Sequence, residues 1–194
     1  VDSLSGYSQT RITVGSIRDE DFGLTTRGCA ITLVPFDDTL DFGSNPKFKS
    51  FYFNMELDTI SLSMENQRHI LQNINVYELT EPIGDRYDLN TSLEHGKDRI
   101  SQGIPVFNGE DDSVSFKFTN EFGEKYMKIL LEDTKDLETY TKKFPGIFIN
   151  TDDPLGIGGR INIFKLQLDC NASSGLIFGN YAELSFSSEY NGAA

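Results

Sequence analysis

The fold class is decided by residues 51–58, which read FYFNMELD. Apolar side chains stand at every second position, at Phe51, Phe53, Met55 and Leu57. Because successive side chains of a β-strand point to opposite faces, this alternation predicts a strand that buries one face and exposes the other. Tyr52 falls on the exposed face.

The same alternation recurs along the chain, interrupted by turn residues such as Asn108-Gly109. It predicts further strands at residues 11–17, 27–34, 70–79, 113–119, 146–150 and 181–187. Two more are expected at 60–64 and 161–168, where the apolar positions change phase by one residue. Such a change indicates a bulge or a tight corner.

One segment follows a helical period instead. Its apolar residues are Phe122, Tyr126, Ile129 and Leu130. Asn120 is available as the N-cap, and a second helical stretch around Tyr140 is stopped by Pro145. We therefore predict an all-β fold, an antiparallel β-sandwich of jelly-roll type with a helical insertion around residues 120–144.

Length and charge limit the alternatives. The 194 residues, 38% of them hydrophobic, suffice for one β-sandwich domain over residues 1–194, which can be a piece of a longer secreted protein. The 17 Lys and Arg against 30 Asp and Glu give a net charge of −13, which repels a phosphate backbone and excludes nucleic acid as a partner. No stretch reaches the roughly 18–20 consecutive apolar residues of a transmembrane helix.

The two cysteines, Cys29 and Cys170, match no metal-binding or thioredoxin-type spacing. Cys29 lies in phase with Ile31 and Leu33, which favours a small buried core residue. A disulfide between the two cysteines remains an alternative.

Several short motifs follow one another in a recognisable order. They are Thr10-Arg11 before Val14-Gly15-Ser16, DEDFG at 19–23 before Thr25-Thr26, LDTISL at 57–62, NVYELT at 75–80, and FPGIFI at 144–149 before a glycine-rich turn. Over residues 10–168 this order resembles the Bacteroidetes secreted-lipoprotein family known as domain of unknown function four-two-seven-zero.

The resemblance implies an exported protein of the cell envelope or outer surface, with a jelly-roll body like those of carbohydrate-binding and adhesin modules. It implies attachment to the membrane only through a lipidated cysteine upstream of Val1, and it implies no reaction. In the motif Asp21-Phe22-Gly23 we expect the glycine to finish a turn with positive φ while Phe22 buries its ring and holds an edge hairpin in place.

Nothing in the sequence assigns a catalytic residue, and the chain is interpreted as not being an enzyme. It lacks the G-x-S-x-G, H-E-x-x-H and P-loop motifs. Of its two histidines, His95 is expected in a solvated loop, and His69 is expected to be exposed or to cap an element. The GIGGR segment at 156–160 is interpreted as a flexible hairpin turn that leaves Arg160 beside a binding face.

Acidic residues cluster in the predicted loops, and carboxylate and amide oxygens are the ligands that Ca²⁺ prefers. The candidate calcium ligands are Asn150, Asp152 and Asp153. None of the clusters has the spaced pattern of a calcium loop. We favour the interpretation that these residues build turns and keep the surface soluble, so no cofactor is predicted.

Three functional hypotheses follow. The favoured one is a non-catalytic surface module that binds another surface protein, which an exposed apolar patch or a pairing edge strand would support. The second is a carbohydrate-binding module, with Tyr52, Tyr181 and Arg160 as the candidate residues that contact the ligand. The third is a glycan-acting hydrolase, which needs two carboxyl groups with opposed pKa shifts in one cleft.

Overall fold

The computed structural model describes residues 11–35, 40–63, 65–84, 92–132, 136–165 and 180–189. Its elements are β1 (Arg11–Asp19), β2 (Gly23–Arg27), β3 (Cys29–Ile31), β4 (Ser44–Glu56), α1 (Thr59–Leu62), α2 (Glu65–Arg68), β5 (Gln72–Leu79), β6 (His95–Arg99), β7 (Val106–Phe107), β8 (Ser113–Lys117), α3 (Asn120–Leu131), α4 (Leu137–Lys143), β9 (Ile147–Thr151), β10 (Gly158–Lys165) and β11 (Tyr181–Glu189). Every strand pair within these residues is antiparallel, which confirms the all-β, antiparallel class.

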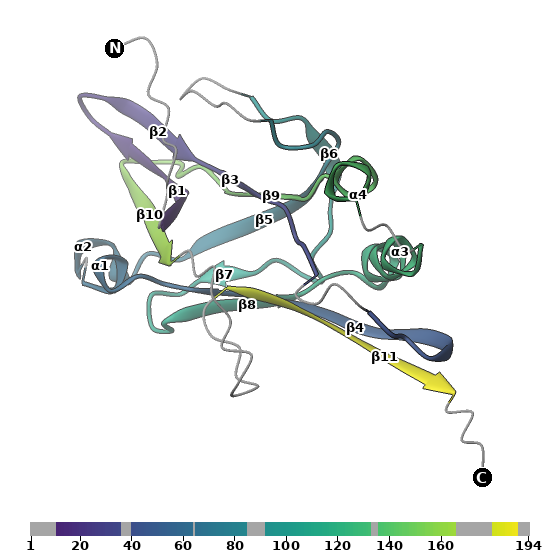
Figure 1. The fold of residues 1–194 in the computed structure, drawn as a ribbon. Helices are drawn as coiled ribbons and strands as arrows, with labels where there is room; N and C mark the ends of the chain where they lie inside the picture. The colour runs from purple at the N-terminus through teal and green to yellow at the C-terminus, as the bar shows by residue number, and fades with distance from the viewer. Residues whose placement is uncertain are drawn as a thin grey trace.

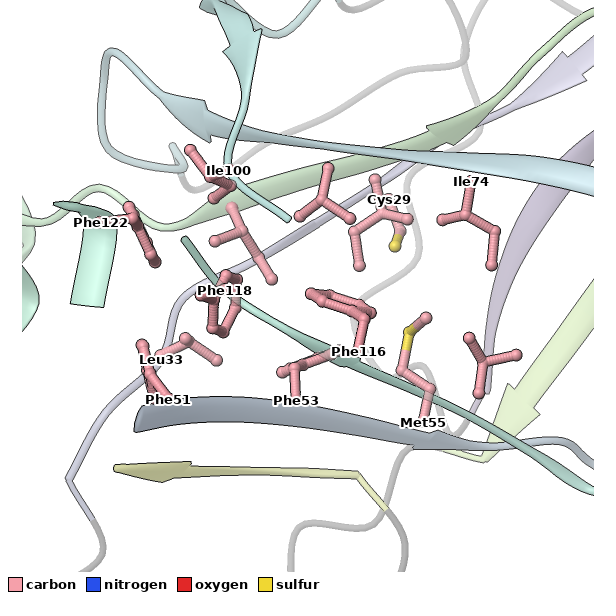
Figure 2. Close-up of a cluster of buried hydrophobic side chains, with 14 of the residues drawn as sticks. Cys29, Leu33, Phe51, Phe53, Met55, Ile74, Ile100, Phe116, Phe118 and Phe122 are labelled. Atoms are coloured by element: carbon pink, nitrogen blue, oxygen red, sulfur yellow. The ribbon is translucent and has the colours of Figure 1, made fainter. Parts of the chain in front are cut away.

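Two sheets face each other across the core (Figure 1). One has the strand order β3-β9-β5-β6, with β7 paired to β5, and the other has the order β11-β4-β8. Figure 2 shows Phe53 and Met55 pointing from β4 toward Cys29 and Ile74 on the opposite sheet. The alternating apolar residues of the sequence therefore form the inner faces of a sandwich.

Helices α3 and α4 lie at one end of this sandwich, as the helical insertion predicts. The side chain of Thr119, rather than that of Asn120, caps α3 by accepting the N–H of Phe122 at 3.3 Å. Both residue types are good caps, so the sequence located this helix start to within one residue. Helix α3 buries Phe122 and Tyr126 against the sandwich.

The third sheet, β10-β1-β2, lies at the other end of the molecule from these helices (Figure 1). It is tied to the sandwich by an isolated bridge between Leu57 and Phe164 and by a hydrogen bond from the N–H of Asp58 to the carbonyl of Ile163. Its hairpin β1–β2 and the start of β10 reach away from the core.

Two segments differ from the sequence prediction. The expected strand at 60–64 is wrong, because the side chain of Asp58 accepts the N–H of Ile60 and starts the short helix α1 there. The expected loop around His95 is also wrong, since residues 95–99 form strand β6 beside β5. Local alternation and polarity cannot show these outcomes, because capping and strand pairing decide them.

Strand β10 alternates without a change of phase in its described part. The side chains that it buries are Arg160, Asn162 and Phe164, while Ile161 and Ile163 are only partly buried. Cys29 is a buried free thiol, as expected for a core residue, and burial raises its pKa to about 12. Cys170 lies outside the described residues.

Candidate interaction surface

The β1–β2 turn holds its aromatic residue out in solvent. The Asp19 carboxylate accepts the N–H groups of Asp21 and Phe22 at 2.8 and 3.1 Å, and Gly23 completes the turn with a φ of 73°. Asp19 and Gly23 are the last paired residues of the ladder, so Phe22 lies beyond it. Its side chain is 88% exposed, and the expectation that it buries its ring is therefore wrong. The positive φ of the glycine was predicted correctly.

A second loop lies at the same end of the sheet, between β9 and β10. It is anchored to β1, where the Ser16 hydroxyl donates to Asp153 at 2.8 Å and the Arg18 guanidinium donates to the carbonyl of Pro154 at 3.2 Å. Beyond these anchors Leu155 is fully exposed and Ile157 is 67% exposed. The hydrogen bonds hold the loop in place without burying its apolar side chains.

The register of the sheet brings these two loops together. Arg18 pairs with Leu24 on β2 and with Gly158 on β10, so the turn and the loop flank the same end of β1 (Figure 1). We call Phe22, Leu24, Leu155 and Ile157 the apolar tip.

Acidic residues border the apolar tip. Asp19, Glu20 and Asp21 are exposed in the β1–β2 turn, and Asp153 is exposed in the neighbouring loop. Clustered exposed apolar residues with a charged border are typical of surfaces that bind another molecule, whereas single exposed apolar residues are ordinary.

The structure brings Tyr52 and Tyr181 together on the outer face of the β11-β4-β8 sheet. Tyr181 pairs with Asn54, two residues from Tyr52 on the same face of β4. The two tyrosines are therefore diagonal neighbours, at a distance that long side chains can bridge. The ammonium of Lys117 lies 5.8 Å from the centre of the Tyr52 ring.

Arg160 does not join these tyrosines. It lies on the inner face of β10 with 2% of its surface exposed, and its guanidinium is 5.8 Å from the ring centre of Phe107. Burial lowers its pKa, because the charged form loses hydration. The expectation of a flexible turn at 156–160 is wrong for its last three residues, because Gly158, Gly159 and Arg160 are strand residues.

Two of the three candidate calcium ligands, Asp152 and Asp153, are bound by different side chains. Both carboxylate oxygens of Asp152 accept side-chain amides, from Asn73 and Asn75 at 2.9 Å each, and these bonds lower its pKa. Asp153 instead accepts the Ser16 hydroxyl. The side-chain oxygen of Asn150 is buried without a hydrogen-bond partner among the described residues. No group of three or more His, Cys, Asp or Glu side chains suited to a metal ion occurs in that part of the chain.

Sequence reasoning missed an aromatic column on the outer face of the β9-β5-β6 sheet. The His95 ring stacks with the rings of both Tyr77 and Phe148, with centroid distances of 4.7 and 4.8 Å. Only the pairing of β5 with β6 and β9 shows the column. His69 is exposed just after α2.

Comparisons with known proteins add no relationship: no family model, no curated protein and no solved structure matches the chain. None of the helices in the described segments is both long enough and apolar enough to cross a membrane.

Proposed function

We propose that this chain is a non-catalytic surface module that binds another protein through its apolar tip. The observation that carries the proposal is the gathering of Phe22, Leu24, Leu155 and Ile157 at one exposed end of the molecule. Removing such side chains from water is favourable by about 25 cal/mol for each Å² of apolar surface, so a partner that covers them gains affinity.

The acidic border indicates the chemistry of the partner. Asp19, Glu20 and Asp21 repel anionic lipid headgroups and nucleic acid, as does the net charge of −13. They attract a protein surface on which Lys and Arg surround an apolar depression, since complementary charge speeds association and selects the partner.

Three carboxyl groups whose pKa values are shifted hold parts of the scaffold together. Hydrogen bonds that they accept lower the pKa values of Asp58, Asp136 and Asp152, the first two from the Ile60 N–H and from Thr139. A glycosidase needs one carboxyl group with a raised pKa to act as its general acid. These three groups are suited to capping and bridging instead.

The proposal includes the jelly-roll topology and the cell-envelope location that the family resemblance implies, with attachment through an upstream lipid anchor. The antiparallel pairing of the strands supports a jelly roll without distinguishing it from other sandwiches.

A carbohydrate-binding module is the second candidate, because Tyr52 and Tyr181 share one exposed sheet face with Asn54, Lys117 and Glu183. Tyrosine rings can stack on sugars, and the neighbouring polar groups can hydrogen-bond to hydroxyls. A glycan array with the wild type and Tyr52→Ala tests this candidate: reproducible binding to one sugar class that the substitution abolishes would place it first.

The favoured proposal is tested by affinity capture from the cell envelope of the source organism. We expect the variant Leu155→Ser/Ile157→Ser to lose a protein that the wild type retains. A matched control, Leu71→Ser/Leu137→Ser, removes leucines that are 70% and 61% exposed elsewhere, and it should retain that protein. Equal capture by all three forms, or binding of the wild type to protein-free lipid vesicles that the tip variant loses, would refute the proposal.

A further inference from the structure

Strand β2 is an exposed edge. It is the last strand in the order β10-β1-β2, all five of its residues are exposed, and within the described residues it pairs with β1 alone. Natural edge strands are protected by proline, by lysine or by a bulge. In β2 the two β-branched residues Thr25 and Thr26 favour strand pairing, and the one charged residue, Arg27, stands at its end.

The charges along this edge are opposite at its two ends. Asp19, Glu20 and Asp21 precede β2, and Arg27 ends it. An antiparallel partner with the same sequence reverses that order, so each acidic end meets a basic end. The edge is thus complementary to itself under two-fold symmetry, which is the requirement for an isologous dimer.

One two-fold register, with the axis at the middle residue of β2, pairs all five residues of the strand. With the two-fold axis at Thr25, Leu24 lies opposite Thr26 of the second copy, and Arg27 lies opposite its Gly23. Arg27 then lies next to the β1–β2 turn of the second copy, where its long side chain can form an ion pair with the exposed Asp21. Symmetry forms this ion pair twice.

We propose that two copies of this chain pair through β2, joining their three-stranded sheets into one six-stranded antiparallel sheet. This inference rests on the proposed function, since it names a second copy as a partner for the same end of the molecule. Leu155 and Ile157 lie on the β9–β10 loop rather than on β2, and they stay available to a different protein.

Sedimentation velocity over a concentration series in about 0.15 M salt, where the Debye length is about 8 Å, tests the pairing. We expect a monomer–dimer equilibrium for the wild type. Arg27→Glu and Asp21→Lys should each weaken it by about tenfold or more, because each turns two attractive contacts into repulsive ones. The double variant Asp21→Lys/Arg27→Glu should restore dimerisation, which loss of folding could not do.

The outcomes separate this inference from the proposed function. A wild type that stays monomeric at every concentration, or a dimer unaffected by either single substitution, would overturn the β2 pairing. Capture of an envelope protein through Leu155 and Ile157 would then still stand. Conversely, a dimer that the double variant Asp21→Lys/Arg27→Glu restores supports the pairing. It does so even if the wild type and the Leu155→Ser/Ile157→Ser variant capture the same proteins.

Discussion

The exposure of Phe22 makes a quantitative prediction when it is compared with Phe118. Phe118 is 0% exposed, and its ring lies 4.6 Å from that of Phe51 and 4.9 Å from that of Phe122, measured between centroids. It connects the β11-β4-β8 sheet to helix α3. The substitutions Phe22→Ala and Phe118→Ala remove the same atoms, so their difference in stability reports the environment of the two rings alone.

The magnitudes follow from burial. A fully buried Phe side chain hides about 200 Å², which at about 25 cal/mol per Å² amounts to about 5 kcal/mol. Phe→Ala substitutions in protein cores cost on the order of 3–5 kcal/mol, which agrees with this value. For a protein of this size Phe118→Ala should lower the melting temperature by about 6–20 °C. Phe22→Ala should change the free energy of unfolding by about 0.5 kcal/mol or less, as surface substitutions do.

Urea denaturation followed by circular dichroism measures both free energies of unfolding, and differential scanning calorimetry measures both melting temperatures. A loss of more than about 2 kcal/mol for Phe22→Ala would show that the ring is buried. The apolar tip would then not exist as described, and the proposed binding surface would lose its central residue.

Three further predictions concern the scaffold. Asp58→Asn should lower the free energy of unfolding near neutral pH and make it depend less on pH in the acid range. The pKa of Asp58 is lowered in the folded state, so the stability that its carboxylate contributes is present above the unfolded-state pKa and is lost as the pH falls through the folded-state pKa. Urea titrations from pH 2 to 7 measure this. In a Cys170→Ser background, Cys29 should resist a thiol reagent until the protein is denatured, because burial raises its pKa. Gly15→Ala should cost more than about 1 kcal/mol, since its Cβ would lie 2.1 Å from a carbonyl oxygen of β10, whereas Gly156→Ala, with nothing within 4 Å, should change stability little.

The parts of the fold that could be predicted from the sequence are those where burial follows local alternation. Phe51, Phe53 and Met55 in β4 are buried, and so are Val114 and Phe116 in β8. These strands face a single apolar layer, so the period of two in the sequence is also the period of burial. The helical insertion was predictable for the same reason, since α3 packs one face on the core.

Sequence patterns did not predict the structure where contacts between residues far apart in the chain determine it. Residues 95–99 read HGKDR, which has no strand pattern, yet pairing with β5 makes them strand β6. The polar network beside it, in which Arg99 donates to Asn75 and Asn75 donates to Asp152, is likewise invisible until the strands are adjacent. The position of the apolar tip has the same origin, because it depends on the pairing of β1 with both β2 and β10.

The sheet that carries the apolar tip also contains a buried polar layer. Ser16, Arg160 and Asn162 fill the inner face of β1 and β10 there, and Gln72 binds them: its amide donates to the carbonyls of Ser16 and Arg160 at 3.3 and 3.1 Å and accepts from Asn162 at 3.1 Å. Breaking those bonds to make room for an apolar side chain would cost free energy for each group left unsatisfied. The same bonds hold β1 and β10 in one arrangement before any partner arrives. Binding at the tip then needs little ordering of the backbone, which reduces the entropy lost on association.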